Sequence, residues 1–350
     1  MGEKTRTAAL KELNNEPLNL PTVSASPHMR SRDTTTGIML DVIVALIPSL
    51  IAAAALFGLR ALAVTGVSVL SCLIFEYISR KVMKRNNTLN DLSAVVTGIL
   101  LAFNLPSSIP FWMVIIGAFI AIVIVKQFFG GIGHNFVNPA LIGRIILMSS
   151  FPTAMTTWTG SFVRAGADAV SSATPLASLS EIFIQGDFSE ASFSTLPSNL
   201  SLFFGQTGGG LGETCSIAIL IGMIYLIARR VISPIIPLTY IGSVALIMLI
   251  AGGGNISFLI AQILSGGLLL GAVFMATDYT TSPTNSKGKF IYAIGCGVIT
   301  SIIRLYGNLP EGVSFAIILM NILTPLIDYI TKPKPFGYVK QSKKEKEAAN

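Results

Sequence analysis

The sequence predicts an all-α membrane protein of about ten transmembrane helices. Of its 350 residues, 52% are hydrophobic and 12% are charged, whereas about 25% are charged in an ordinary soluble domain. Apolar runs recur along the chain, and most basic residues lie in short clusters between them. A soluble core of this size cannot bury so much apolar surface, so we expect the lipid bilayer to be the solvent for these segments.

Ten apolar runs follow one another along the chain. They lie near 38–59, 61–79, 92–105, 109–125, 137–151, 213–228, 234–251, 256–277, 289–306 and 311–330. A membrane helix needs about 17–25 residues, so the runs 92–105 and 137–151 are short. Short or interrupted segments often line binding sites in membrane proteins. Five runs per half would make any internal duplication an inverted one, although no convincing sequence repeat is visible.

The basic residues predict how these helices are oriented. With the N-terminus in the cytoplasm, 20 of the 24 Lys and Arg residues, including Lys126 after the fourth run, fall on the cytoplasmic side. Basic loops on that side are what the positive-inside rule expects. The resulting segments are a cytoplasmic N-terminal tail 1–36, a first membrane half 37–151, an extracytoplasmic loop 152–212, a second membrane half 213–331 and a basic cytoplasmic C-terminal tail 332–350.

Composition also excludes several functional classes. The net charge of +7 is spread between apolar runs, as a topology signal and not as a surface for nucleic acid. Cys72, Cys215 and Cys296 lie singly in apolar segments with no CxxC pair, so the chain cannot hold an iron–sulfur cluster by itself. The two histidines, His28 and His134, are isolated, and we expect no metal site.

The outward loop contains one segment in which a carboxylate precedes several small and hydroxyl-bearing residues. It reads Asp168-Ala-Val-Ser171-Ser172-Ala173-Thr174, followed by Pro and Leu. Taken alone, this composition is also typical of an ordinary Ser/Thr-rich loop with a proline turn. The segment resembles the flavinylation pattern Asp-x-x-Ser-Gly-Ala-Thr, in which a flavin transferase attaches FMN to the last threonine through a phosphoester. The resemblance implies Thr174 as the acceptor, and Ser172 departs from the usual Gly.

Longer motifs extend this resemblance over nearly the whole chain from residue 24 onward. They are DLSAVVTGILLAFNLP at 91–106, FGGIGHNFVNPALIGRIILMSSFP at 129–152, LGETCSIAILIGMIYL at 211–226, MATDYTTSPTNSKGK at 275–289 and IRLYGNLPEGVSFAIILMNILTPLID at 303–328. In these segments the chain resembles the D subunits of Rnf-type ion-translocating ferredoxin:NAD oxidoreductases. A related family, the B subunits of sodium-pumping NADH:quinone reductases, is the nearest alternative.

The resemblance implies a multi-pass subunit of the bacterial cell membrane that is not catalytic alone. It would carry FMN on Thr174 and work with iron–sulfur, flavin and NADH-binding subunits to couple electron transfer between ferredoxin and NAD to Na+ or H+ translocation. The family also suggests a second, non-covalent flavin such as riboflavin, which no motif locates. A non-redox channel of the urea type is the alternative from another functional class, since fold does not fix function.

Several charged residues outside this motif are candidates for a role. Arg144 and Arg304 lie in apolar runs, where a buried arginine needs a carboxylate, carbonyls or an anionic ligand. We consider Arg304 a candidate for binding the flavin, and snorkelling to the membrane surface is the alternative. No carboxylate is clearly at mid-membrane, and TDYTTSP at 277–283 is the strongest candidate for a broken helix.

Overall fold

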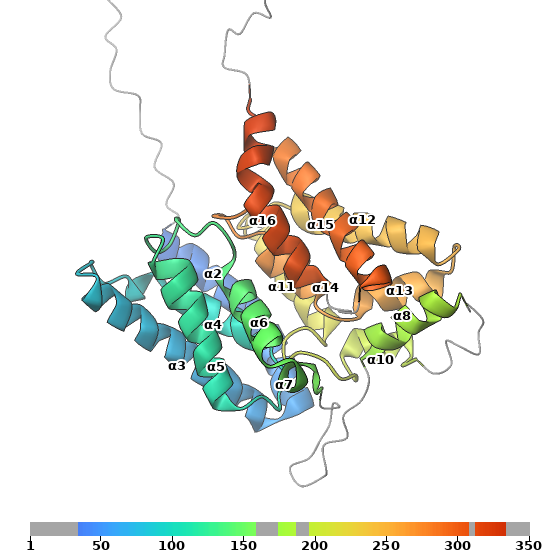
Figure 1. Cartoon of the computed structure of the whole chain (residues 1–350), viewed down its shortest axis with the longest axis horizontal. Helices are drawn as coiled ribbons and strands as arrows, with labels where there is room; N and C mark the ends of the chain where they lie inside the picture. The colour runs from blue at the N-terminus through green and yellow to red at the C-terminus, as the bar shows by residue number, and fades with distance from the viewer. Residues whose placement is uncertain (1–33, 159–173, 187–195, 308–311, 334–350) are drawn as a thin grey trace, which may run out of the picture. The chain divides into compact units, whose positions relative to one another are not determined.

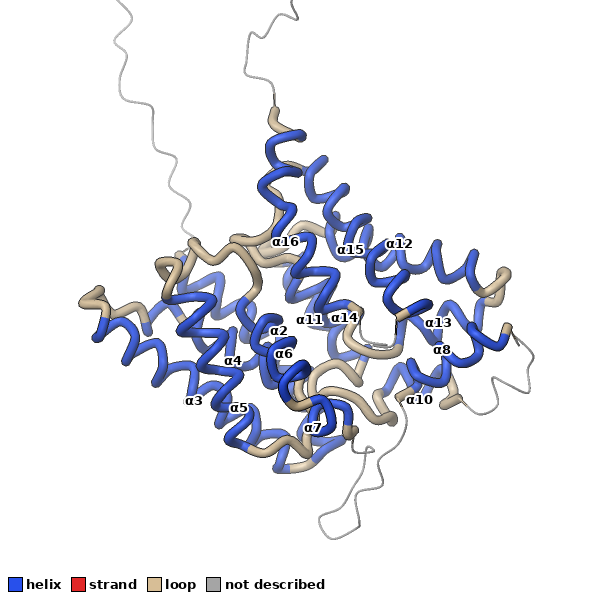
Figure 2. The backbone as a smooth tube through the Cα atoms, viewed as in Figure 1, coloured by secondary structure: helices blue, strands red, loops and turns tan. Residues whose placement is uncertain are grey.

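The computed structural model of the chain describes residues 34–158, 174–186, 196–307 and 312–333, and within these every regular element is a helix (Figures 1 and 2). The elements of the first half are α2 (Thr35–Phe57), α3 (Leu59–Val82), a 3-10 turn (Leu89–Asp91), α4 (Ser93–Phe103), α5 (Phe111–Phe119) with its π-helical continuation (Ile120–Gln127), and α6 (Pro139–Ser150). The elements of the second half are α11 (Ser216–Ala228), α12 (Ile235–Ala251), α13 (Ile256–Leu264), α14 (Leu268–Leu270) with its π-helical continuation (Gly271–Met275), α15 (Ser286–Tyr306) and α16 (Val313–Ile330).

The segment between the halves also forms helices where the structure describes it. These are α7 (Pro152–Thr156), α8 (Pro175–Gln185) and α10 (Asn199–Phe204). The sequence predicts an irregular loop over 152–212, and the described parts of that segment are therefore more regular than expected. Proline at the first position of α7 and α8 suits a helix start, because its fixed backbone angle is helical and its missing N–H is not needed there.

Four helices are long and apolar enough to cross a membrane: α2, α3, α15 and α16. A fifth span results if α13 and the segment Leu268–Met275, which meet at a bend of 63°, count as one. The remaining apolar runs form helices of 10–17 residues, so ten complete spans stay a prediction. The expected short runs 92–105 and 137–151 correspond to α4 and α6, which have 11 and 12 residues.

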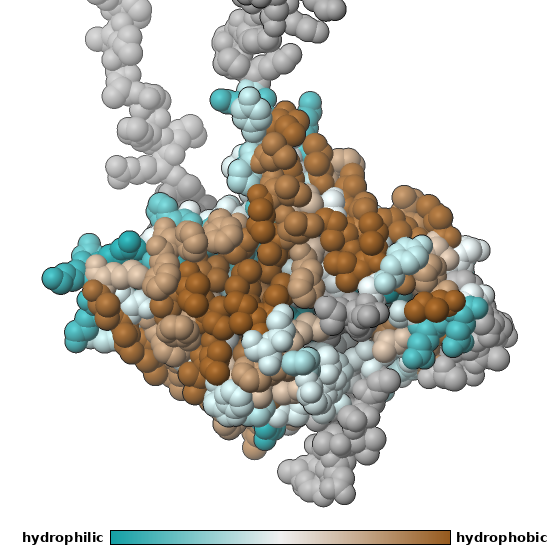
Figure 3. All heavy atoms as spheres, in the orientation of Figure 1, coloured by the Kyte–Doolittle hydropathy of each residue, from teal (hydrophilic) through white to brown (hydrophobic). Residues whose placement is uncertain are grey.

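Exposed apolar side chains cover the outer faces of these helices. In the face shown in Figure 3, hydrophobic surface extends over α5, α15 and α16. Phe119, Ile302 and Leu326 are among the exposed residues, each more than two-fifths accessible. Large contiguous apolar surface is unusual on a soluble monomer. This surface is what a membrane protein presents to lipid.

Inside this surface, the helices of each half pack mainly on one another. α3 packs against α4 and α5, and α12 packs against α15, while α2 meets α11 across the halves. Small residues permit the close approaches. A Cβ on Gly98 of α4 would lie 2.7 Å from the Val69 Cα of α3, so these backbones touch only because position 98 has no side chain.

The structure corrects two predictions about this core. The break in the second half is at 265–267 and not at 277–283, because Gly266 adopts a positive φ of 67° inside a run that reads as continuously apolar. Lys126, expected in a cytoplasmic loop, is buried in the π-helical turn that follows α5. Its Nζ lies 2.8 Å from Glu76 Oε2 and 2.6 Å from Ser93 Oγ, which explains how a lysine is accommodated there.

Candidate functional site

Thr174 is the residue that begins α8. Its backbone is extended, and its Oγ1 accepts a hydrogen bond from the Ala177 amide at 3.4 Å. This N-cap geometry is favoured for Thr, because the side chain satisfies an amide that the helix leaves unpaired. The positive end of the helix dipole also favours negative charge there, so a phosphate on this oxygen would be well placed. Asp168, Ser171, Ser172 and Ala173, the rest of the predicted motif, lie outside the described residues.

A small pocket of about 20 Å³ adjoins Thr174. Its other walls come from parts of the chain that are distant in sequence, namely the glycine-rich segment 207–209, the start of the second half at 213–214, and the helix break at 264–266. The structure therefore brings the predicted flavin acceptor next to the interrupted helix. A pocket of this size cannot hold an isoalloxazine ring, so a flavin on Thr174 would extend outside it.

The glycine-rich segment 205–212 is anchored by its own backbone. The amides of Leu211 and Gly212 donate to the carbonyls of Leu105 and Phe103, each at 3.0 Å, at the C-terminal end of α4. The Gly210 amide donates to Glu213 Oε1 at 2.9 Å. These three donors satisfy groups within the chain, so we do not expect them to bind a flavin phosphate. Only Thr207, Gly208 and Gly209 of this stretch line the pocket.

Glu213 is the central carboxylate of this region. It is only 2% exposed, and its Oε2 accepts no hydrogen bond within the part of the chain that the structure describes. A Cβ at Gly267 would lie 2.7 Å from Oε2 of Glu213 and 3.7 Å from Nη1 of Arg144. The carboxylate and the guanidinium therefore both lie close to the backbone at the helix break. Arg144 itself donates to Asn104 Oδ1 at 2.8 Å and to Ser314 Oγ at 3.0 Å.

Arg304 is buried and holds the other side of the break. Its Nη1 donates to the Gln262 carbonyl at 2.6 Å, and its Nη2 donates to the Ser265 carbonyl at 3.1 Å. These carbonyls are at the C-terminal end of α13, where they lack helical partners and where the helix dipole favours a cation. The sequence prediction that Arg304 is buried and needs partners is thus met by carbonyls, and no contact of this residue with Thr174 is seen among the described residues.

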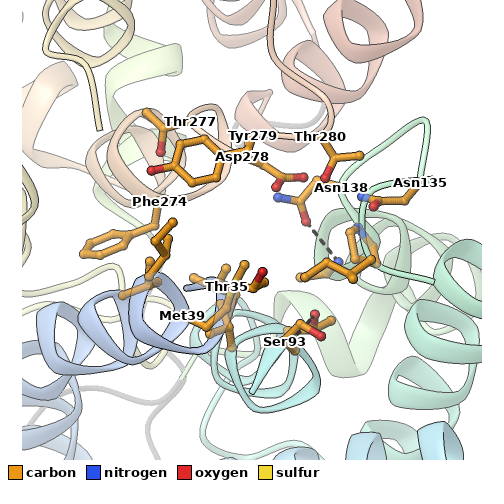
Figure 4. Close-up of a pocket in the computed structure, with 18 of the residues that line it drawn as sticks. Thr35, Met39, Ser93, Asn135, Asn138, Phe274, Thr277, Asp278, Tyr279 and Thr280 are labelled. Carbon is orange, nitrogen blue, oxygen red and sulfur yellow. Dashed lines mark hydrogen bonds between the residues drawn. The ribbon is translucent and has the colours of Figure 1, made fainter. Parts of the chain in front are cut away.

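A second and larger cavity, of about 400 Å³, lies between α2, α4, α6 and the loop after Met275 (Figure 4). One side is polar and includes Asn135, Asn138 and the segment Thr277–Thr280, whereas Met39 and Phe274 contribute apolar surface. Asn138 also caps α6, accepting from the Ala140 amide at 3.0 Å. The volume is in the range of small-molecule sites, and the mixed lining suits a ligand with both ring and hydroxyl groups.

Asp278 lies at the polar side of this cavity, in the loop beyond the bent helix pair. Burial raises the pKa of its carboxyl, and hydrogen bonds from the Thr280 backbone and from the side chains of Thr281 and Asn135 partly oppose that shift. The protonated form of Asp278 is therefore more favourable here than in water.

The sequence indicates Thr174 and both buried arginines but not the small pocket, because the walls of that pocket come from four separate segments. It places Glu213 only near the outer end of an apolar run. The one local signal is that Glu213 directly follows the glycine-rich stretch. Among the described residues no group of three His, Cys, Asp or Glu side chains is arranged to bind a metal, and the three cysteines are buried without a disulfide.

Comparison with known proteins shows which family the chain resembles. Residues 22–337 match the model of the NQR2, RnfD, RnfE family. The chain is 47% identical to the D subunit of the Na+-translocating ferredoxin:NAD+ oxidoreductase complex of Acetobacterium woodii, over 94% of this chain and 99% of the relative. It is 42% identical to the D subunit of the proton-translocating ferredoxin:NAD+ oxidoreductase complex of Clostridium ljungdahlii, over 91% and 97%.

A more distant relative is also a D subunit of an ion-translocating complex. The D subunit of the ion-translocating oxidoreductase complex of Stutzerimonas stutzeri is 37% identical, over 87% of this chain and 93% of the relative. The resemblance to D subunits that the motifs predict is therefore confirmed, and these relatives are named as oxidoreductase subunits and not as channels. The apolar helices and the match over most of the chain lead to one conclusion: this membrane protein belongs to the NQR2, RnfD, RnfE family.

Proposed function

We propose that this chain carries FMN as a phosphoester on Thr174 within an Rnf-type complex, which couples electron transfer between ferredoxin and NAD to Na+ or H+ translocation. The observation that carries the proposal is the position of Thr174 at the N-cap of α8, where a phosphate would lie at the positive end of a helix. Two relatives are named as subunits of ferredoxin:NAD+ oxidoreductase complexes, and these names support the redox role.

The bound flavin would supply reversible electron transfer, and the chain would contribute the tether and its surroundings. Thr174 would hold the phosphate and α8 would stabilise its charge. Arg304 supports the site indirectly, since it fixes the helix break that forms one wall of the adjoining pocket. NAD and ferredoxin would bind partner subunits of the complex, which carry the iron–sulfur, flavin and NADH-binding sites. The flavin on Thr174 would exchange electrons with another flavin-bearing subunit on the extracytoplasmic side of a bacterial cell membrane.

A non-covalent second flavin, riboflavin, is part of the same proposal. The 400 Å³ cavity between α2, α4 and α6 is the place in the described structure that suits it by size. The polar groups at Asn135, Asn138 and Thr277–Thr280 would hydrogen-bond ribityl hydroxyls or ring carbonyls, and Met39 and Phe274 would contact the ring. Riboflavin extracted from the purified chain after denaturation, and lost on Thr280→Val substitution at a residue that lines the cavity, would support this assignment.

The FMN proposal is tested by expressing the chain with a flavin transferase and examining the denatured protein under ultraviolet light. We expect a fluorescent band from the wild type, no band from Thr174→Ala, and an unchanged band from Thr207→Ala. Thr207 is the matched control because it is a second threonine lining the same pocket but outside the motif. Fluorescence that survives in Thr174→Ala would place the flavin elsewhere.

A further inference from the structure

Three residues that line the pocket beside Thr174 each carry a buried oxygen atom without a hydrogen-bond partner in the described part of the chain. These atoms are Oε2 of Glu213, Oγ1 of Thr214 and Oγ of Ser265, in residues that are 2%, 6% and 3% exposed. Buried polar side chains are rarely left unpaired, and each unsatisfied group is costly. Three such atoms lining one pocket therefore point to a bound species that satisfies them together.

The size and chemistry of the pocket restrict that species. Its volume of about 20 Å³ holds one water molecule or one dehydrated ion and nothing larger. The three atoms are a carboxylate oxygen and two hydroxyl oxygens, which are hard ligands that suit alkali or alkaline-earth cations and not soft metals. The pocket also lies at the C-terminal end of α13, and interrupted helices form Na+ sites in other membrane proteins. Because Arg304 already binds the Gln262 and Ser265 carbonyls there, the ligands must come from the three side chains.

The surrounding charges restrict the ion to a monovalent one. Arg304 is already bound to the carbonyls of Gln262 and Ser265 at the end of α13, and Arg144 lies close to Glu213 at Gly267. Two arginines and one glutamate sum to a single positive charge. A phosphodiester on Thr174, which rests on the proposed function above, would bring that sum to zero. One monovalent cation can then be added at modest electrostatic cost, whereas a divalent cation would leave a larger uncompensated charge.

We propose that Glu213, Thr214 and Ser265 form a Na+-binding site at the helix break next to Thr174. The carboxylate supplies the charge, and the two hydroxyls supply neutral ligands. Glu213 Oε1 is held by the Gly210 amide, and Oε2, which has no partner among the described residues, is the atom that would bind the ion. Arg304 fixes the carbonyls that shape the break, so it acts as a positioning residue. This assigns a specific place in the chain for an ion in the Na+ or H+ translocation of the complex.

The test is a Na+ titration of the purified full-length chain, with NaCl replaced by choline chloride at constant ionic strength. A ligand that binds only the folded state raises the unfolding temperature of the protein in a concentration-dependent way. We expect Na+ to stabilise the wild type and the apparent affinity to fall at least tenfold in Glu213→Gln and in Ser265→Ala. Ser49→Ala is the matched control, because Ser49 is equally buried and also lacks a partner but lies in α2, outside the pocket.

An unfolding temperature that does not respond to Na+, or a response that Ser265→Ala and Thr214→Val leave unchanged, would overturn the proposal and indicate a buried water only. Should Glu213→Gln fail to fold, the two hydroxyl variants decide the question. K+ in place of Na+ tests whether the small pocket is selective, and a response to K+ as strong as that to Na+ would contradict the dehydrated Na+ site.

Thr174→Val separates this inference from the proposed function. Without the phosphate we expect weaker Na+ binding that still depends on Ser265. If the wild type carries no FMN but shows a Na+ response that requires Ser265, the proposed flavin site fails and the cation site stands. If FMN is attached to the wild type and no variant alters a Na+ response, the cation site fails and the flavin site stands.

Discussion

Replacing Lys126 by Met would leave the carboxylate of Glu76 buried and without its cation. Glu76 is 0% exposed, and its Oε2 lies 2.8 Å from Lys126 Nζ. Removing one partner of a buried pair typically costs about 3–5 kcal/mol, because the remaining charge cannot return to water. Thr88 and Gln127 still donate to Oε1, at 2.9 and 3.1 Å, so we expect a value near the lower limit, about 3 kcal/mol.

The assay is reversible unfolding of the chain in mixed micelles with increasing dodecyl sulfate. Lys81→Met, at an exposed lysine in the last turn of α3, is the control and should change the free energy of unfolding by less than about 0.5 kcal/mol. The double variant Glu76→Gln/Lys126→Met should recover most of the loss, since neither charge then remains. A loss below about 1 kcal/mol in Lys126→Met, or a double variant as unstable as the sum of the singles, would refute this reasoning.

Three further substitutions test other contacts. Arg304→Leu should destabilise the chain by about 2–4 kcal/mol in the same unfolding assay, since it leaves the Gln262 and Ser265 carbonyls unpaired, and a neutral effect would show that water replaces it. Gly212→Ala should cost about 1–3 kcal/mol because its Cβ would overlap the Phe103 ring, unless that ring can move. Asp278→Asn should remove a pH-dependent part of the stability. Because burial raises the folded-state pKa of Asp278, its contribution to stability is present at low pH and is lost as pH rises through that pKa. A difference in the free energy of unfolding between wild type and variant that is constant with pH would contradict this.

The helices can be predicted well from the sequence because the bilayer imposes a strong composition signal. Each of the ten apolar runs corresponds to a helix or a bent helix pair in the structure. The position of the bend cannot be predicted in the same way. The break Ser265-Gly266-Gly267 is short and lies between long apolar stretches, whereas the segment 277–283 is more polar and therefore looks more like a break. Hydropathy reports average composition, and a two-glycine interruption changes that average very little.

The site can be predicted only where a single local motif carries it. Thr174 is such a case, because its motif is contiguous. Arg304 stands out as an arginine outside the topological pattern, but its partners are carbonyls of a helix break, which no side-chain pattern reveals. The prediction that Lys126 lies in a loop after the fourth run is wrong, because a basic residue at the end of an apolar run usually marks a loop and the buried partner Glu76 is 50 positions away. Contacts of that kind depend on tertiary packing and are not visible in the sequence.

The most direct test of the central claim is mass spectrometry of the chain isolated from cells that express a flavin transferase. Intact mass would be recorded first, and proteolytic fragments would then be sequenced to locate any modification. We predict a mass increase equal to FMN less one water, confined to the fragment that contains Thr174. A chain of unmodified mass, despite a transferase shown to be active on another substrate, would contradict the account, as would FMN on any residue other than Thr174.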